Sequence, residues 1–161
     1  MSTSSPIGVA AALASATPTR STLNAFSLVD RVALVTGGQR GIGLEIALAL
    51  VEAGAVVYCL DLPKTPDENW FKVQKYAAEL PSLGTTGNLN SRLEYISADV
   101  TNQAMMWAKA EEIANVEGRL DICVANAGIL RGAECLDYPA DEFQQVCVFP
   151  VSFYFLKISI V

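Results

Sequence analysis

Residues 31–43 read RVALVTGGQRGIG, a short apolar run that ends in a cluster of glycines. The run predicts a strand, and apolar residues then recur at helical spacing at Ile42, Ile46 and Leu50, up to a helix-ending Gly54. A helix that follows a glycine turn offers free N–H groups and a positive dipole end to phosphates. The order strand, glycine turn and helix therefore predicts a nucleotide-binding turn.

Three glycines of this turn, Gly37, Gly41 and Gly43, are assigned to the predicted site. Side chains at such positions would keep the backbone away from a pyrophosphate, whereas glycine permits close approach. Arg40 and Ile42 lie between these glycines and are included in the site. A glycine cluster also forms plain turns, but the strand before it and the helix after it favour nucleotide binding.

The alternation of strand and helix continues along the chain. We expect three further strands, at 55–61, at 93–100 and at 120–128, the last of which closes in a turn. An exposed helix is expected over 64–80. Another helix is predicted from a cap at Thr101 to Gly118, with Met106, Ala110 and Ile113 on one face. These elements predict an α/β fold, the N-terminal part of a Rossmann-type, doubly wound parallel sheet.

Asp61 ends the second predicted strand, where a carboxylate can accept hydrogen bonds from the hydroxyls of an adenosine ribose. The same carboxylate would repel a 2′-phosphate, which favours NAD over NADP. Arg40 favours NADP instead, because a guanidinium can pair with that phosphate. A solvated aspartate in a turn before Pro63 is the plain alternative. We expect NAD as the cofactor, with NADP as the alternative.

Composition excludes several classes of function. A chain of 161 residues is long enough for one domain, and its net charge of −6 carries no nucleic-acid footprint. The sequence has no histidine, which excludes Ser-His-Asp and Cys-His nucleophile systems and zinc sites that use histidine. We expect no metal site, no nucleic-acid partner and no membrane span.

The four cysteines show no C-x-x-C pattern, and two of them lie in apolar, strand-like runs. They are Cys59, Cys123, Cys135 and Cys147. Buried free thiols in a reducing compartment are expected, and the cytoplasm is the expected location.

Residues 1–28 hold a single charge, Arg20, and are expected to form a disordered leader. A mitochondrial transit peptide or a weak signal peptide remains the alternative for this leader.

Three motifs, in the right order, resemble those of the short-chain dehydrogenase/reductase superfamily. TGGQRGIG (36–43) matches the family's T-G-x-x-x-G-I-G. ADV (98–100) is similar to the family segment in which Asp99 and Val100 would contact the adenine ring. The resemblance implies a dinucleotide cofactor as the principal binding partner.

The third motif is ANAG (125–128), which resembles the family's N-N-A-G with Ala125 in place of the first asparagine. The resemblance places three of these residues in the cofactor site: Asn126, Ala127 and Gly128. It covers residues 28 to about 146 and implies an incomplete NAD(P)-binding Rossmann domain over 29–146.

Two further segments narrow the resemblance. FSLVDRVALVTGG (26–38) and PADEFQQV (139–146) are similar to fungal sugar-alcohol dehydrogenases and ketose reductases such as sorbose reductases. They imply NAD(P)-dependent oxidoreduction of a sugar or polyol, or of another alcohol or ketone. A small-molecule substrate is expected only for a full-length form.

The end of the chain departs from the family pattern. The family has a helical asparagine, then a serine and a Tyr-x-x-x-Lys pair, whereas an ungapped comparison places Pro150 at the asparagine position. Tyr154 and Lys157 are three apart rather than four, so neither is given a role. We therefore expect no catalytic residue in this chain.

Residues 147–161 are almost wholly apolar and carry one charge. We expect this segment to be an aberrant tail, either a translated intron or another splicing or gene-model artefact. A buried terminal strand or a membrane anchor would also be apolar, but the run is short for a span. The alternative function is a non-catalytic dinucleotide-binding or interaction fragment that associates with full-length relatives.

Overall fold

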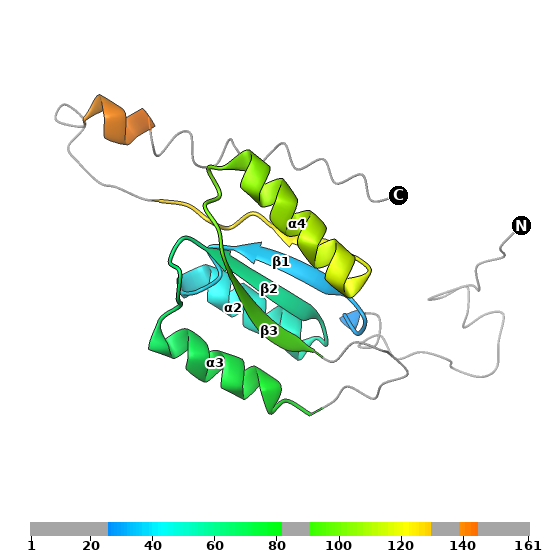
Figure 1. Ribbon diagram of the computed structural model, residues 1–161. Coiled ribbons are helices and arrows are strands. Elements are labelled where there is room, and N and C mark those ends of the chain that lie inside the picture. The colour runs from blue at the N-terminus through cyan, green and yellow to red at the C-terminus, as the bar shows by residue number, and fades with distance from the viewer. Residues whose placement is uncertain (1–25, 82–90, 130–138, 145–161) are drawn as a thin grey trace, which may run out of the picture.

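The structure is a computed structural model that describes residues 26–81, 91–129 and 139–144. Its centre is a parallel sheet of four strands in the order β3-β2-β1-β4 (Figure 1). The strands are β1 (Val32–Thr36), β2 (Val56–Asp61), β3 (Arg92–Ser97) and β4 (Ile122–Val124). The predicted α/β fold with a parallel sheet is confirmed.

Three helices cover the two faces of the sheet, and their labels follow Figure 1. They are α2 (Gly41–Glu52), α3 (Glu68–Ala78) and α4 (Gln103–Glu117). Alternate residues of β1 face opposite cores: Val32 and Leu34 pack in the cluster that holds the α4 side chains. Ala33 and Val35 pack in the cluster that holds side chains of α2 and α3. The continuous apolar run of β1 is thus buried on both faces, as in other parallel sheets.

The predicted apolar face of α4 is confirmed, but its cap is one residue later than expected. Met106, Ala110 and Ile113 are all buried. Asn102, rather than Thr101, is the N-cap residue, and its side chain accepts a hydrogen bond from Met105 N. The Thr101 hydroxyl instead donates to the preceding Asp99 carboxylate at 2.7 Å.

Two strands are shorter than predicted, because side chains take over their backbone hydrogen bonds. The strand expected over 93–100 ends at Ser97, since Asp99 forms a turn in which its Oδ1 accepts from Thr101 N at 2.9 Å. The strand expected over 120–128 is only Ile122–Val124. After it, the N–H groups of Asn126 and Ala127 donate to the side-chain hydroxyl of Thr36 in the neighbouring β1, rather than to a backbone carbonyl of that strand.

The exposed helix expected over 64–80 begins later, at Glu68. Asp67 caps it by accepting a hydrogen bond from Trp70 N at 2.9 Å. Pro66 disfavours helical backbone at the residue before it, which keeps 64–65 outside the helix. Trp70 is only 1% exposed, so one side of this surface helix is firmly anchored.

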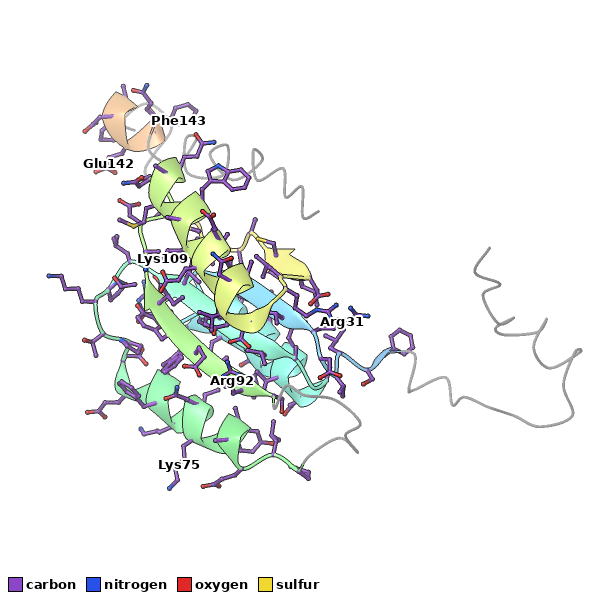
Figure 2. All side chains as sticks on the ribbon, turned by 45° about the vertical axis from the view of Figure 1, so that its right-hand side comes forward. Arg31, Lys75, Arg92, Lys109, Glu142 and Phe143 are labelled. Atoms are coloured by element: carbon purple, nitrogen blue, oxygen red, sulfur yellow. The ribbon has the colours of Figure 1, made fainter. Side chains whose placement is uncertain are left out.

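Ion pairs lie at the amino ends of the strands, opposite the glycine turn. Asp121, just before β4, accepts from Arg119 Nε at 2.8 Å, from Arg31 Nη1 at 3.0 Å and from Val32 N at 2.9 Å. Figure 2 shows Arg31 where the chain enters β1, and Arg92 at the start of β3. Arg92 pairs with the nearly buried carboxylate of Glu117, at the end of α4.

Several expectations fall on segments outside the described residues. They concern most of the leader (1–25), Cys135, Cys147 and the tail over 147–161. Within the described ranges, Cys59 is a buried free thiol and Cys123 a partly buried one. No helix in these ranges has the length and apolarity needed to cross a membrane.

Candidate functional site

The glycine turn between β1 and α2 is packed so tightly that Gly37, Gly38 and Gly43 leave no room for a side chain. A Cβ on Gly38 would lie 2.8 Å from the Cys59 Cβ. A Cβ on Gly43 would lie 2.1 Å from the Gly37 carbonyl oxygen. A Cβ on Gly37, where φ is +64°, would lie 2.9 Å from Ala127 Cα. Gly41 differs, because its φ is +56° but a Cβ there would meet none of the described atoms within 4 Å. The backbone at Gly41 therefore borders open space.

The N-terminus of α2 is open to an anion. Arg40 is the N-cap residue, and a guanidinium has no acceptor with which to satisfy the N–H groups of the first turn. The first turn also contains no acidic residue. These N–H groups and the positive end of the helix dipole suit the phosphates of a dinucleotide. Ile42, the other non-glycine residue assigned to the site, is 74% exposed.

Thr36 and Asn126 join the glycine turn to the end of β4. Thr36 Oγ1 accepts from Asn126 N at 3.1 Å and from Ala127 N at 3.0 Å. Asn126 Nδ2 donates to the carbonyl oxygens of Thr36 at 2.9 Å and Gly37 at 3.2 Å. Thr36 was not among the predicted site residues. Its polar side chain at the end of an apolar strand was the available signal, and it is fully buried.

Asp61 lies beside the glycine turn at the carboxyl end of β2. Its Oδ2 accepts from Gln39 N at 3.2 Å, and its Oδ1 accepts from Leu62 N at 2.9 Å. Each carboxylate oxygen has a second lone pair, so both can still accept from a ribose hydroxyl. Gln39, a largely buried residue of the turn, was also missed by the sequence analysis. Its contribution comes from the backbone, which its residue type does not reveal.

The other predicted residues lie at the same edge of the sheet with less direct connections. The Asp99 carboxylate is turned towards Thr101, and Val100 is buried in the core beneath α4. Gly128 is exposed, and a Cβ there would touch only the Asn126 carbonyl oxygen, at 3.9 Å. The structure thus brings Asp61, Asn126 and Ala127 against the glycine turn. Among the described residues, no hydrogen bond joins Asp99, Val100 or Gly128 to the turn.

Burial determines the protonation of two side chains near Asp61. Burial raises the pKa of the Cys59 thiol to about 12, and the nearby Asp61 charge adds to this while the Trp70 indole opposes it. Burial likewise raises the pKa of Tyr95 to about 12, and the Asp61 charge again contributes. Both groups stay protonated near neutral pH.

Among the described residues, no group of three His, Cys, Asp or Glu side chains is placed to hold a metal ion.

A parallel sheet with a tight glycine turn before an uncapped helix and a carboxylate at the end of the next strand defines a dinucleotide-binding α/β domain. Residues 31–155 match the family model described as short chain dehydrogenase. The chain belongs to the short-chain dehydrogenase family.

Individual relatives agree with this assignment. The chain is 36% identical over 121 residues to the rhamnolipids biosynthesis 3-oxoacyl-[acyl-carrier-protein] reductase of Pseudomonas aeruginosa, covering 75% of this chain and 42% of that protein. It is similar to the crystal structure of a short-chain type dehydrogenase/reductase from Mycobacterium marinum (TM-score 0.69, 30% identity), covering 83% of this chain and 49% of the other.

The Pseudomonas aeruginosa RhlG/NADP active-site complex is also similar, with a TM-score of 0.63 and 32% identity over 80% of this chain and 46% of that one. The chain thus spans less than half the length of these relatives. Family membership supports a nicotinamide dinucleotide as the cofactor.

Proposed function

We propose that this chain forms the dinucleotide-binding part of an NAD(P)-dependent oxidoreductase and that it prefers NAD to NADP. The observation that carries the preference is the position of the Asp61 carboxylate, held beside the glycine turn by Gln39 N–H and Leu62 N–H. A carboxylate at this point accepts from the 2′- and 3′-hydroxyls of an adenosine ribose and repels a phosphate at the 2′ position.

Arg40 is the observation against this preference. It is exposed at the N-cap of α2, where a guanidinium can reach a phosphate group. One relative was solved as an NADP complex. Asp61 outweighs Arg40 because its carboxylate is fixed by two backbone N–H groups, whereas an exposed arginine can turn into solvent.

The proposed reaction is hydride transfer between the nicotinamide and an alcohol or ketone, by resemblance a sugar or polyol. The name of the Pseudomonas reductase specifies a 3-oxoacyl group, whose oxo carbon is a ketone. This chain would bind and orient the cofactor through its glycine turn and Asp61. The acid/base serine, tyrosine and lysine of the family pattern, and the substrate, are proposed to belong to a full-length form.

Calorimetric titration of the 161-residue chain with NAD and with NADP tests this proposal. We expect NAD to bind more tightly than NADP. We expect Asp61→Ala to weaken NAD at least several-fold, because a charge-assisted hydrogen bond contributes on the order of 1.5–3 kcal/mol. Glu52→Ala, which removes an exposed carboxylate at the far end of α2, is the matched control and leaves both affinities unchanged. Equal wild-type affinity for the two cofactors contradicts the preference.

A further inference from the structure

The chain that follows Asp61 is held to β3 through three successive carbonyl groups. The Asp61 carbonyl oxygen accepts from Ala98 N at 2.8 Å, which continues the pairing of β2 with β3. The next two carbonyls are held by side chains instead. The Leu62 oxygen accepts from Ser97 Oγ at 3.3 Å, and the Pro63 oxygen accepts from Tyr95 Oη at 2.6 Å.

Tyr95 is itself fixed by packing. Its ring meets the buried Trp70 of α3 edge-to-face, with centroids 5.4 Å apart and an interplanar angle of 68°. Its raised pKa keeps the hydroxyl protonated, so it remains a donor to Pro63 across the neutral range. Leu62 and Pro63, in contrast, are exposed and have little packing of their own to hold them.

The position of this exposed segment controls the Asp61 carboxylate. Leu62 N donates to Asp61 Oδ1 at 2.9 Å, so the orientation of the Leu62 peptide fixes one of the two carboxylate oxygens. If the segment were free, ligand binding would have to order both the loop and the carboxylate, and that entropy loss would reduce affinity. With the hydrogen bonds from Tyr95 and Ser97, the loop and the carboxylate are already ordered before the ligand binds.

We propose that Tyr95 and Ser97 are positioning residues for the adenosine half of the dinucleotide. They act through Leu62 and Pro63 to hold the Asp61 carboxylate in its ribose-binding orientation, without touching the ligand themselves. This inference rests on the proposed function, since it assumes that a dinucleotide binds at Asp61.

The test measures Kd for NAD and for AMP by calorimetry on the full chain, because AMP carries only the adenosine half. Tyr95→Phe keeps the ring against Trp70 and removes the donor, and we expect it to weaken both ligands about three- to ten-fold, the range for one hydrogen bond. Ser97→Ala is expected to weaken both by about two-fold, since its bond is longer. Tyr76→Phe is the matched control, because the Tyr76 hydroxyl is exposed on α3 and has no hydrogen bond among the described residues.

A double-mutant cycle distinguishes positioning from general destabilisation. In an Asp61→Ala background, Tyr95→Phe and Ser97→Ala should no longer change either Kd, because the carboxylate they orient is gone. Unchanged Kd values in the single variants, or an equal loss with and without Asp61, overturn the inference and leave the proposed function standing. If Tyr95→Phe fails to fold by circular dichroism, Ser97→Ala decides by the same cycle. If the wild-type chain binds neither ligand, the proposed function and this inference fall together.

Discussion

Asn126 donates two hydrogen bonds to Thr36 across the carboxyl ends of β1 and β4. The Asn126 backbone N–H donates to Thr36 Oγ1, and the Asn126 side-chain amide donates to the Thr36 carbonyl oxygen. Because the same amide also donates to the Gly37 carbonyl, the shape of the glycine turn depends on a residue that follows the neighbouring strand β4, 89 positions later in the sequence.

Replacing Thr36 with valine should therefore destabilise the fold. Thr36→Val keeps the shape of the side chain but leaves the Ala127 N–H without its acceptor and the Asn126 N–H with only the Val124 carbonyl. An unsatisfied buried donor costs about 1–3 kcal/mol. Urea unfolding followed by circular dichroism measures the loss. Thr65→Val, at an exposed loop position, is the control and should leave the midpoint unchanged. Equal midpoints for the two variants would contradict the structural role of the hydroxyl.

Two glycines of the same turn should respond differently to alanine. Gly43→Ala places a methyl group 2.1 Å from the Gly37 carbonyl, so the turn must move and nucleotide binding should be lost. Gly41→Ala meets no described atom and suffers only from its positive φ, a cost of about 1–2 kcal/mol. Thermal unfolding with and without NAD compares them. A Gly43→Ala variant that NAD stabilises as strongly as wild type would show that the turn tolerates the methyl group.

The Asp121 carboxylate should make stability depend on pH in the acid range. Its hydrogen bond from Arg119, with help from Val32 N–H and Arg31, lowers its pKa from 3.8 to about 2 despite partial burial. Since the folded-state pKa is depressed, the contribution of Asp121 is fully present above the unfolded value and is lost as pH falls from 3.8 towards 2. Urea unfolding of wild type and Asp121→Asn should show a stability difference at neutral pH that shrinks over this window. A difference that does not change with pH would rule out this carboxylate as the titrating group.

Cys59 should resist alkylation in the folded protein. With a pKa of about 12, only about 10⁻⁴ of the thiol is ionised at pH 8, and burial excludes the reagent as well. Iodoacetamide treatment followed by peptide mass spectrometry should leave Cys59 unmodified, while the same treatment in guanidinium chloride should alkylate it fully. Rapid labelling without denaturant would mean that β2 opens readily.

Local patterns in the sequence were sufficient to predict the position of an element where one interaction determines it. β1, the glycine turn and α2 follow from apolar periodicity and from glycine geometry, and all three lie where they were predicted. The end of α4 at Gly118 could also be predicted, because the left-handed backbone there (φ +74°) is one that glycine adopts readily.

The misplaced boundaries come from side chains that compete with the backbone. Asp99 accepts from Thr101 and ends β3 early, which also moves the helix cap to Asn102. A periodicity pattern counts Ala98 and Val100 as apolar strand residues and does not register the turn between them. Apolar patterning cannot detect such competition, because it depends on the geometry of a single polar residue.

The missed members of the site depend on contacts between distant segments. Thr36 meets Asn126, 90 positions away, and Asp61 meets Gln39, 22 positions away. The strand order determines both contacts, and a local pattern does not specify strand order. The resemblance to known motifs placed Asn126 and Ala127 in the site and included Thr36 in the first motif, but it gave the Thr36 hydroxyl no role.

The strand order β3-β2-β1-β4 makes β1 the place where the path of the chain reverses direction across the sheet. The chain leaves β1 by α2 towards β2, whereas β4 arrives on the other side of β1 after the crossover through α4 (Figure 1). The carboxyl ends of β1 and β4 form a topological switch point, the place where open α/β sheets receive their ligands. A ligand bound there would lie against the first and the last strand of this sheet in sequence order. Its stabilising effect, RT ln(1 + [L]/Kd), would therefore report the completion of β4 as well as the integrity of the glycine turn.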